Sequence, residues 1–147
     1  MKISKIKISL LIVIALAITI SIFYFSKQQP PTIFIGGEKI EVELMATPEA
    51  QAKGLSGREG LKENSGMLFV FPKPDYYGFW MKDMKFSIDM IWLDSAGKVV
   101  HIERNVAPET YPKVFTPALP ANYVLEVIAG FSDQNSLKIG DYAKFKI

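Results

Sequence analysis

An uncharged run of 18 residues near the start of the chain is the feature that most limits how it can fold. It covers residues 8–25, with the sequence ISLLIVIALAITISIFYF. As a helix rising 1.5 Å per residue, this run is about 27 Å long, close to the thickness of a bilayer core. Three lysines precede the run and one follows it, an asymmetry that predicts a cytoplasmic N-terminus. The run therefore predicts a single-pass signal anchor in the cell membrane, with the C-terminal domain outside the cytoplasm.

A cleaved signal peptide and a secreted chain are the alternative. The segment 15–17 (Ala-Leu-Ala) has the small-x-small form of a cleavage site, but it lies inside the apolar run. Aromatic residues occupy 23–25, where cleavage needs small side chains and where a membrane interface favours aromatic ones. The pattern favours the uncleaved anchor.

The anchor divides the chain into four predicted parts. These are a basic cytoplasmic segment (1–7), the transmembrane helix (8–25), a short linker ending in Pro-Pro (26–31) and a single domain (32–147). Beyond residue 29 the chain carries 13 basic and 15 acidic side chains, so the positive charge belongs to the anchor and no nucleic-acid partner is expected. Cysteine is absent, which excludes disulfides, thiolate zinc sites and a cysteine nucleophile.

Short strands dominate the predicted domain. Apolar residues alternate with polar ones over 39–44, as in a half-buried strand. Thr47 and Pro48 mark the start of a helix that Gly54 ends after about two turns. The remaining predicted strands are 67–71, 79–82, 88–93, 99–104, 123–128 and 143–147. This pattern predicts a mainly β fold, a single β-sandwich with one short helix, preceded by the transmembrane helix.

Five ordered blocks of sequence carry a resemblance to a known family. They are GLSGR (54–58), GMLFVF (66–71), FWMK (79–82), IDMIWLD (88–94) and YVLEVIAG (123–130). In order and spacing they resemble the DUF192 (UPF0127) family over nearly all of residues 38–147. The resemblance implies a jelly-roll-like β-sandwich, commonly exported or membrane-anchored, with no assigned activity. Many relatives carry a cysteine pair in the loop matching 106–121, which this chain lacks.

An aromatic cluster over 69–92 holds eight of the 18 aromatic residues. Most of them are expected in the core. Tyr76 and Tyr77 lie between a proline and a glycine, where a core position is less natural, and with Trp80 they form a candidate platform for sugar rings or other flat ligands. Packing in the core or at its rim is the alternative.

Asp89 is the most informative single residue. Alternation places it on one face of its strand with Ile91 and Leu93, although both faces of that strand are apolar. A carboxylate there is costly unless it is paired with a cation or capped by backbone amides. A binding-site carboxylate in a pocket wall is the alternative.

Other charged residues join Asp89 in a predicted ligand-binding site. Arg58 suits a bidentate contact with a carboxylate, or is a solvated loop residue. Lys82 shares a strand face with Trp80. Glu126 lies on the same face as Val124 and Ile128, which suggests a buried or half-buried acid with a partner. The predicted ligand-binding residues are therefore Arg58, Tyr76, Tyr77, Trp80, Lys82, Asp89 and Glu126.

Standard catalytic and metal motifs are weak. A serine triad would need His101, the single histidine, and residues 54–57 (Gly-Leu-Ser-Gly) are not a nucleophile elbow. A copper site built from Met81, Met84 and Met90 with His101 is less expected than core packing of these methionines. No metal and no cofactor is predicted.

The most favoured function is a non-catalytic binding module for a cell-envelope ligand or partner, with carbohydrate as one candidate. One alternative is a hydrolase that acts on envelope polysaccharide through Asp89 and Glu126. The other is a purely structural or assembly domain.

Overall fold

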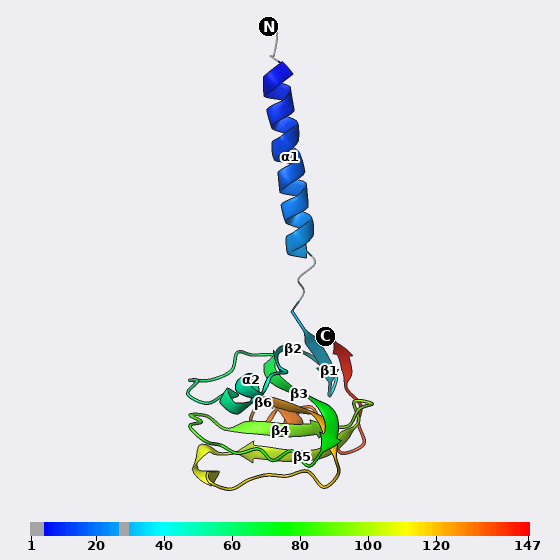
Figure 1. Ribbon diagram of the computed structural model, residues 1–147. Coiled ribbons are helices and arrows are strands. Elements are labelled where there is room, and N and C mark those ends of the chain that lie inside the picture. The colour runs from blue at the N-terminus through cyan, green and yellow to red at the C-terminus, as the bar shows by residue number, and fades with distance from the viewer. Residues whose placement is uncertain (1–4, 27–29) are drawn as a thin grey trace. The chain divides into compact units, whose positions relative to one another are not determined.

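The computed structural model describes residues 5–26 and 30–147, and the side chains of its N-terminal helix over residues 10–21. This helix, α1 (Lys5–Ser26), belongs to one compact unit, and Pro31–Ile147 forms a second. Figure 1 shows the two units, the second built around a β-sheet. The predicted segments 1–7 and 26–31 fall partly outside the described residues, at 1–4 and 27–29.

The predicted transmembrane helix is not supported. In the part of the chain that the structure describes, no helix is both long and apolar enough to cross a membrane. This finding contradicts the anchor predicted over 8–25 and the single-pass membrane location based on it.

Seven strands form one sheet in the second unit (Figure 1). Their order across the sheet is β5-β4-β6-β3-β2-β1-β7, with β2 and β3 parallel and all other neighbours antiparallel. The strands are β1 (Thr32–Ile35), β2 (Glu38–Met45), β3 (Ser65–Asp75), β4 (Ile88–Leu93), β5 (Val99–Val106), β6 (Ala121–Ile128) and β7 (Lys144–Lys146).

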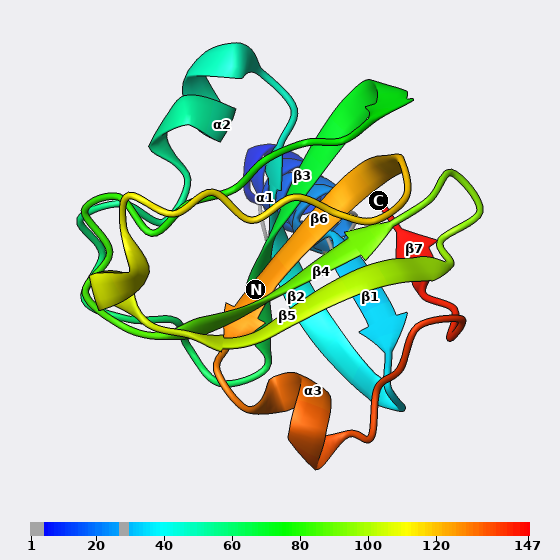
Figure 2. The ribbon, with the colours of Figure 1, turned by 90° about the horizontal axis from the view of Figure 1, so that it is seen from below.

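The sheet curls into a half-barrel (Figure 2), which corrects the predicted β-sandwich of jelly-roll type. At one end its two edges meet: Val99 N–H donates to Asp141 O and Ala143 N–H to Gly97 O, both over 2.8 Å. Gly97 is required there, because its φ is +79° and a Cβ would lie 2.7 Å from Ala143 O. Alternation of side chains predicts the faces of strands but not their neighbours, so the sequence did not reveal that all seven share one sheet.

Both faces of the central strands are buried, and every residue of β4 is inaccessible to solvent. The inner face of the curl packs a cluster that includes Ile91 and Leu93, with Phe131 from the helix α3 (Phe131–Gln134). The outer face is covered by the loops that follow α2 (Pro48–Lys53) and β3, and its core includes Met90 and Trp92. An acidic residue on either face is therefore removed from water.

The predicted short helix is present as α2, with Thr47 Oγ1 accepting a hydrogen bond from Ala50 N–H over 3.3 Å. Gly54 ends it with a φ of +47°. The segment 79–82, predicted as a strand, makes only a single bridge between Phe79 and Phe115. The loop between β5 and β6, which contains the 3₁₀ helix η1 (Pro108–Thr110), is thereby held against the segment after β3.

Candidate functional site

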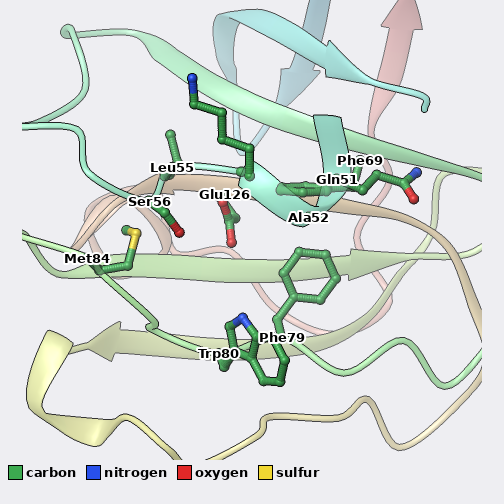
Figure 3. Close-up of a pocket in the computed structure, with 11 residues that line it drawn as sticks. Gln51, Ala52, Leu55, Ser56, Phe69, Phe79, Trp80, Met84 and Glu126 are labelled. Atoms are coloured by element: carbon green, nitrogen blue, oxygen red, sulfur yellow. The ribbon is translucent and has the colours of Figure 1, made fainter. Parts of the chain in front are cut away.

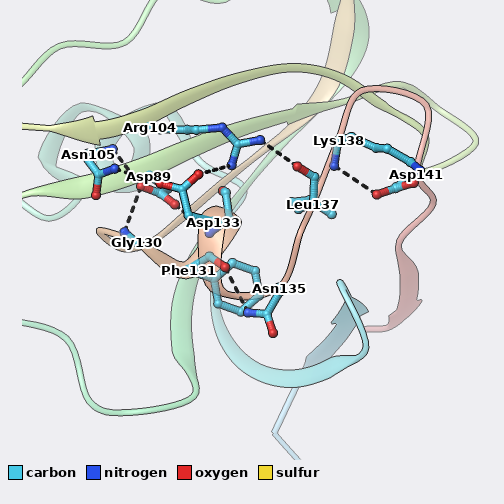
Figure 4. A network of polar contacts seen from close by, with 11 residues as sticks. Asp89, Arg104, Asn105, Gly130, Phe131, Asp133, Asn135, Leu137, Lys138 and Asp141 are labelled. Atoms are coloured by element: carbon cyan, nitrogen blue, oxygen red, sulfur yellow. Dashed lines mark hydrogen bonds and ion pairs between the residues drawn. The ribbon is translucent and has the colours of Figure 1, made fainter.

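Asp89 is fully buried on the inner face, and backbone amides surround its carboxylate (Figure 4). Its Oδ1 accepts from Asn105 N–H over 2.8 Å and from Gly130 N–H over 3.2 Å, and its Oδ2 accepts from Ser132 N–H over 2.7 Å. Of the two structural explanations for this acid, the backbone cap is therefore the one observed. Among the described residues, no lysine or arginine forms an ion pair with it.

A polar network extends this cap along α3. Arg104 pairs with Asp133 over 3.1 Å and donates to Leu137 O over 2.6 Å, and the Asn105 amide donates to Asp133 Oδ2 over 3.1 Å. These contacts fix α3 against the end of β5 (Figure 4). Asp89 thus holds two turns of backbone together, and each of its carboxylate oxygens accepts at least one hydrogen bond from the protein itself.

Glu126 is also a buried acid, but it lies on the other face of the sheet from Asp89 and lacks the backbone cap that Asp89 has. Its side chain lies on the outer face, because Glu126 pairs across the sheet with Met90 and Met67, both members of the outer-face core. It is 5% exposed, and its Oε2 is buried with no hydrogen-bond partner. Burial raises the pKa of the Glu126 carboxyl to about 8, so at neutral pH the group is predominantly protonated and can both donate and accept a hydrogen bond.

A small pocket of about 60 Å³ lies over Glu126 (Figure 3). In the close-up, the Glu126 carboxyl points between α2, the turn that follows it, and the aromatic segment after β3. Most of the lining residues are apolar, but polar atoms make up the larger part of the surface that the pocket presents. The lining residues are Gln51, Ala52, Lys53, Gly54, Leu55, Ser56, Phe69, Phe79, Trp80, Met84 and Glu126.

Specific hydrogen bonds hold the α2 side of this pocket in place. The Gln51 amide donates to Met45 O over 3.1 Å and to Val70 O over 3.0 Å, which ties α2 to β2 and β3. Ser56 Oγ donates to Lys82 O over 2.9 Å. Because the wall is anchored on two sides, the pocket is a preformed feature of the fold.

Trp80 forms the exposed side of the pocket. It is 56% exposed, whereas its neighbour Phe79 points inward and packs edge-to-face on Phe69 at 4.7 Å between ring centroids. The chain's other tryptophan, Trp92, is fully buried and donates its indole N–H to Tyr77 O over 2.9 Å. Trp80 therefore supplies a large apolar surface to solvent beside a buried acid.

The two tyrosines of the predicted platform do not line this pocket. Tyr77 stacks on Phe71 with 3.6 Å between ring centroids, and its hydroxyl donates to Lys73 O over 2.8 Å. Burial, with a smaller effect from the charge of Asp75, raises the pKa of the Tyr77 hydroxyl. Tyr76 is exposed.

Arg58 and Lys82 are also outside the pocket. The Arg58 guanidinium makes a bidentate contact with Glu43, at 2.6 and 2.7 Å. This hydrogen bond lowers the pKa of the Glu43 carboxyl and raises that of Arg58. Of the seven predicted site residues, the structure brings only Trp80 and Glu126 together.

The pocket also includes residues that were not predicted from the sequence as site residues. Phe69 and Phe79 belong to the aromatic cluster over 69–92, and Ser56 lies in the first family block, but none carried a signal for binding. Gln51 was predicted only as a residue of the short helix. Met84 was considered only as a ligand of a copper site that is less expected than core packing. What unites them is the packing of α2 over the sheet, which is a long-range contact.

The arrangement does not unite the two carboxylates proposed for a hydrolase, since Asp89 and Glu126 lie on opposite faces of the sheet. Among the residues that the structure describes, no group of three or more histidine, cysteine or acidic side chains could hold a metal ion. Met81 and Met90, considered for copper, are buried in the outer-face core. His101 contacts Glu103 over 3.1 Å.

Comparison with known proteins gives a family and similar solved structures, including the following two. The model of the DUF192 family, described as "Uncharacterized ACR", matches residues 32–145. A protein of unknown function from Novosphingobium aromaticivorans is 31% identical, with a TM-score of 0.72 over 78% of this chain and 83% of its own. A Sinorhizobium meliloti protein, described as a proposed transcription regulator, is 26% identical, with a TM-score of 0.72 over 78% and 91%. No curated protein matches the chain.

Proposed function

The chain belongs to the DUF192 family, and we propose that its Pro31–Ile147 unit is a non-catalytic binding module whose ligand places a small polar group against Glu126. The observation that carries this proposal is the buried carboxyl of Glu126, which belongs to the lining of a pocket and whose Oε2 has no hydrogen-bond partner. A buried polar atom without a partner costs about 1–3 kcal/mol of stability. A ligand that supplies the missing hydrogen bond recovers that cost on binding.

The composition of the pocket supports binding rather than catalysis. Ligand sites combine apolar and aromatic side chains with a small number of placed polar groups, and this pocket has Phe69, Phe79 and Trp80 beside the Glu126 carboxyl. General acid–base catalysis needs a second group positioned on the reacting bond, or a nucleophile beside a base. Glu126 is the only acidic side chain that lines this pocket, and no histidine lines it.

The test is a titration of the full chain, labelled with ¹⁵N, with four small probes: ethylene glycol, acetamide, acetate and methylammonium. We expect at least one probe to shift the amide signals of 52–56 and the indole N–H signal of Trp80. Glu126→Leu should abolish the shifts, because it removes the carboxyl while keeping an apolar side chain of similar size. Glu49→Leu, on exposed surface of α2, is the matched control and should leave them unchanged.

Two results would overturn the proposal. One is that no small molecule with a polar group, the four probes included, shifts the signals of the pocket residues. The other is that the shifts persist undiminished in Glu126→Leu.

A further inference from the structure

We infer that the group bound at Glu126 is the hydroxymethyl arm of a neutral hexopyranose whose ring lies against Trp80. This inference rests on the proposed function, since it names the ligand class of the same pocket. It follows from the size of the pocket, the character of the group at its base, and the surface at its mouth.

The pocket is large enough for a short substituent of a ligand but too small for a six-membered ring. At about 60 Å³ the pocket takes a few water-sized groups and excludes a six-membered ring. A ligand that reaches Glu126 must therefore insert a short substituent and leave its main body outside. A hydroxymethyl group, one carbon and one hydroxyl, has the required length and bulk.

The base of the pocket matches a hydroxyl. A protonated carboxyl donates one hydrogen bond and accepts others, and a hydroxyl does the same, so the two form a complementary pair. An ammonium group only donates, and Glu126 would have to ionise in a desolvated site to receive it. A carboxylate would have to leave water for a site whose one charged lining residue besides Glu126, Lys53, is exposed.

The mouth of the pocket offers an apolar platform for a ring. Trp80 is exposed, and the bridge between Phe79 and Phe115 places the exposed Val114 opposite it. Gly78 makes this approach feasible, because a Cβ there would lie 2.7 Å from Val114 Cγ1. One face of a pyranose ring presents mainly C–H groups, and such a face packs well on an indole ring.

Ser56 supplies a second polar contact at the rim. Its hydroxyl proton is used in the bond to Lys82 O, so the lone pairs of Oγ are available as acceptors. A ring hydroxyl next to the inserted arm can donate to Ser56 while the arm bonds to Glu126. Two neighbouring hydroxyls of one sugar would thus use two polar groups of the pocket, the Glu126 carboxyl and the Ser56 hydroxyl.

The experiment compares methyl glycosides by the same ¹⁵N titration of the full chain. The neutral hexosides are the methyl β-D-pyranosides of glucose, galactose, mannose and N-acetylglucosamine. Methyl β-D-xylopyranoside is the glucoside without its hydroxymethyl arm. We expect at least one hexoside to bind and the xyloside to bind at least about tenfold more weakly, a difference of about 1.4 kcal/mol. Trp80→Ala should weaken the hexoside at least tenfold, whereas Arg58→Ala, outside the pocket, should leave its affinity unchanged.

The outcomes separate this inference from the proposed function. Binding of acetate or methylammonium at the pocket without any hexoside would overturn the sugar inference and leave the binding module standing. Equal affinity for the xyloside and the hexosides would also overturn it. Failure of every probe and every glycoside would overturn both.

Discussion

Asp89 and Glu126 lie on neighbouring strands, with their buried side chains on opposite faces of the same sheet. Asp89 pairs with Val127 and faces the inside of the curl, where three backbone N–H groups bind its carboxylate. Glu126 pairs with Met90 and faces the outer pocket, where its Oε2 has no partner. One acid is used by the fold, and the other is available to a ligand.

Asp89→Asn should destabilise the fold by about 2–4 kcal/mol. The amide has one acceptor oxygen in place of two, and its NH₂ group would face backbone donors such as Ser132 N–H. Urea denaturation measures the change. Asp83→Asn is the matched control, since Asp83 is exposed with a φ of +56°, which asparagine tolerates. Equal effects of the two substitutions would contradict the role given to Asp89.

Glu126 should make the fold less stable as pH rises from about 4.5 to about 8. The carboxyl ionises near 4.5 in an unfolded chain and near 8 in the fold, so between these values the folded state holds a proton that the unfolded state has lost. The free energy of unfolding then falls by about 1.4 kcal/mol per pH unit. The contribution is fully present below the lower pKa and lost above the higher one.

Urea denaturation across this pH window checks the Glu126 prediction. The side chain introduced by Glu126→Gln cannot ionise. The free energy of unfolding of this variant should therefore not show the wild-type fall of about 1.4 kcal/mol per pH unit. Glu49→Gln, exposed on α2, should retain the wild-type slope. If Glu126→Gln and the wild type have the same slope, Glu126 ionises in the fold as it does in water.

Truncation of the two tryptophans should lower the stability of the fold to very different extents. Trp80→Ala removes an exposed side chain and should change the free energy of unfolding by about 0.5 kcal/mol or less. Trp92→Ala leaves a cavity in the outer-face core and a lost bond to Tyr77 O, at a cost of about 3–5 kcal/mol. Thermal unfolding followed by circular dichroism distinguishes them. A large loss for Trp80→Ala would assign Trp80 to the core rather than to a ligand surface.

Gly66 should be intolerant of a side chain, because a Cβ there would lie 2.8 Å from the backbone oxygen of Glu126. Gly66→Ala is therefore expected to cost about 1–3 kcal/mol, as strands β3 and β6 are forced apart beside the pocket. Gly60→Ala meets no atom within 4 Å and should be neutral or slightly stabilising. Comparing the two melting temperatures tests this. A Gly66→Ala variant as stable as the Gly60 variant would contradict the close approach of β3 and β6.

Local pattern predicted much of the fold. Alternation correctly placed Asp89 with Ile91 and Leu93 and correctly predicted that Glu126 is buried. The partner expected for Glu126 is not observed at its Oε2. Capping residues at Thr47 and Gly54 correctly marked α2. Each of these features depends on residues that are close in the sequence, where backbone geometry alone relates them.

Long-range pairing accounts for what the sequence did not predict. The strand β1 pairs with β7 from the far end of the chain, and the parallel contact of β2 with β3 joins strands that would otherwise separate into two sheets. Arg58 pairs with Glu43 rather than with Asp89 or Glu126. Glu126 and Trp80 meet only because α2 and the segment after β3 fold over the same face, and no local pattern reports that contact.

The ¹³C chemical shift of the Glu126 side-chain carboxyl, followed against pH, tests the central claim most directly. A carboxyl that is buried, without a partner and poised for a ligand should titrate near 8. A bound hexoside should shift this midpoint, because its hydroxyl forms a hydrogen bond whose strength differs between the neutral and the ionised carboxyl. A midpoint near 4.5, unchanged by every glycoside, would show a solvated carboxylate and contradict the account of Glu126 as the base of a binding pocket.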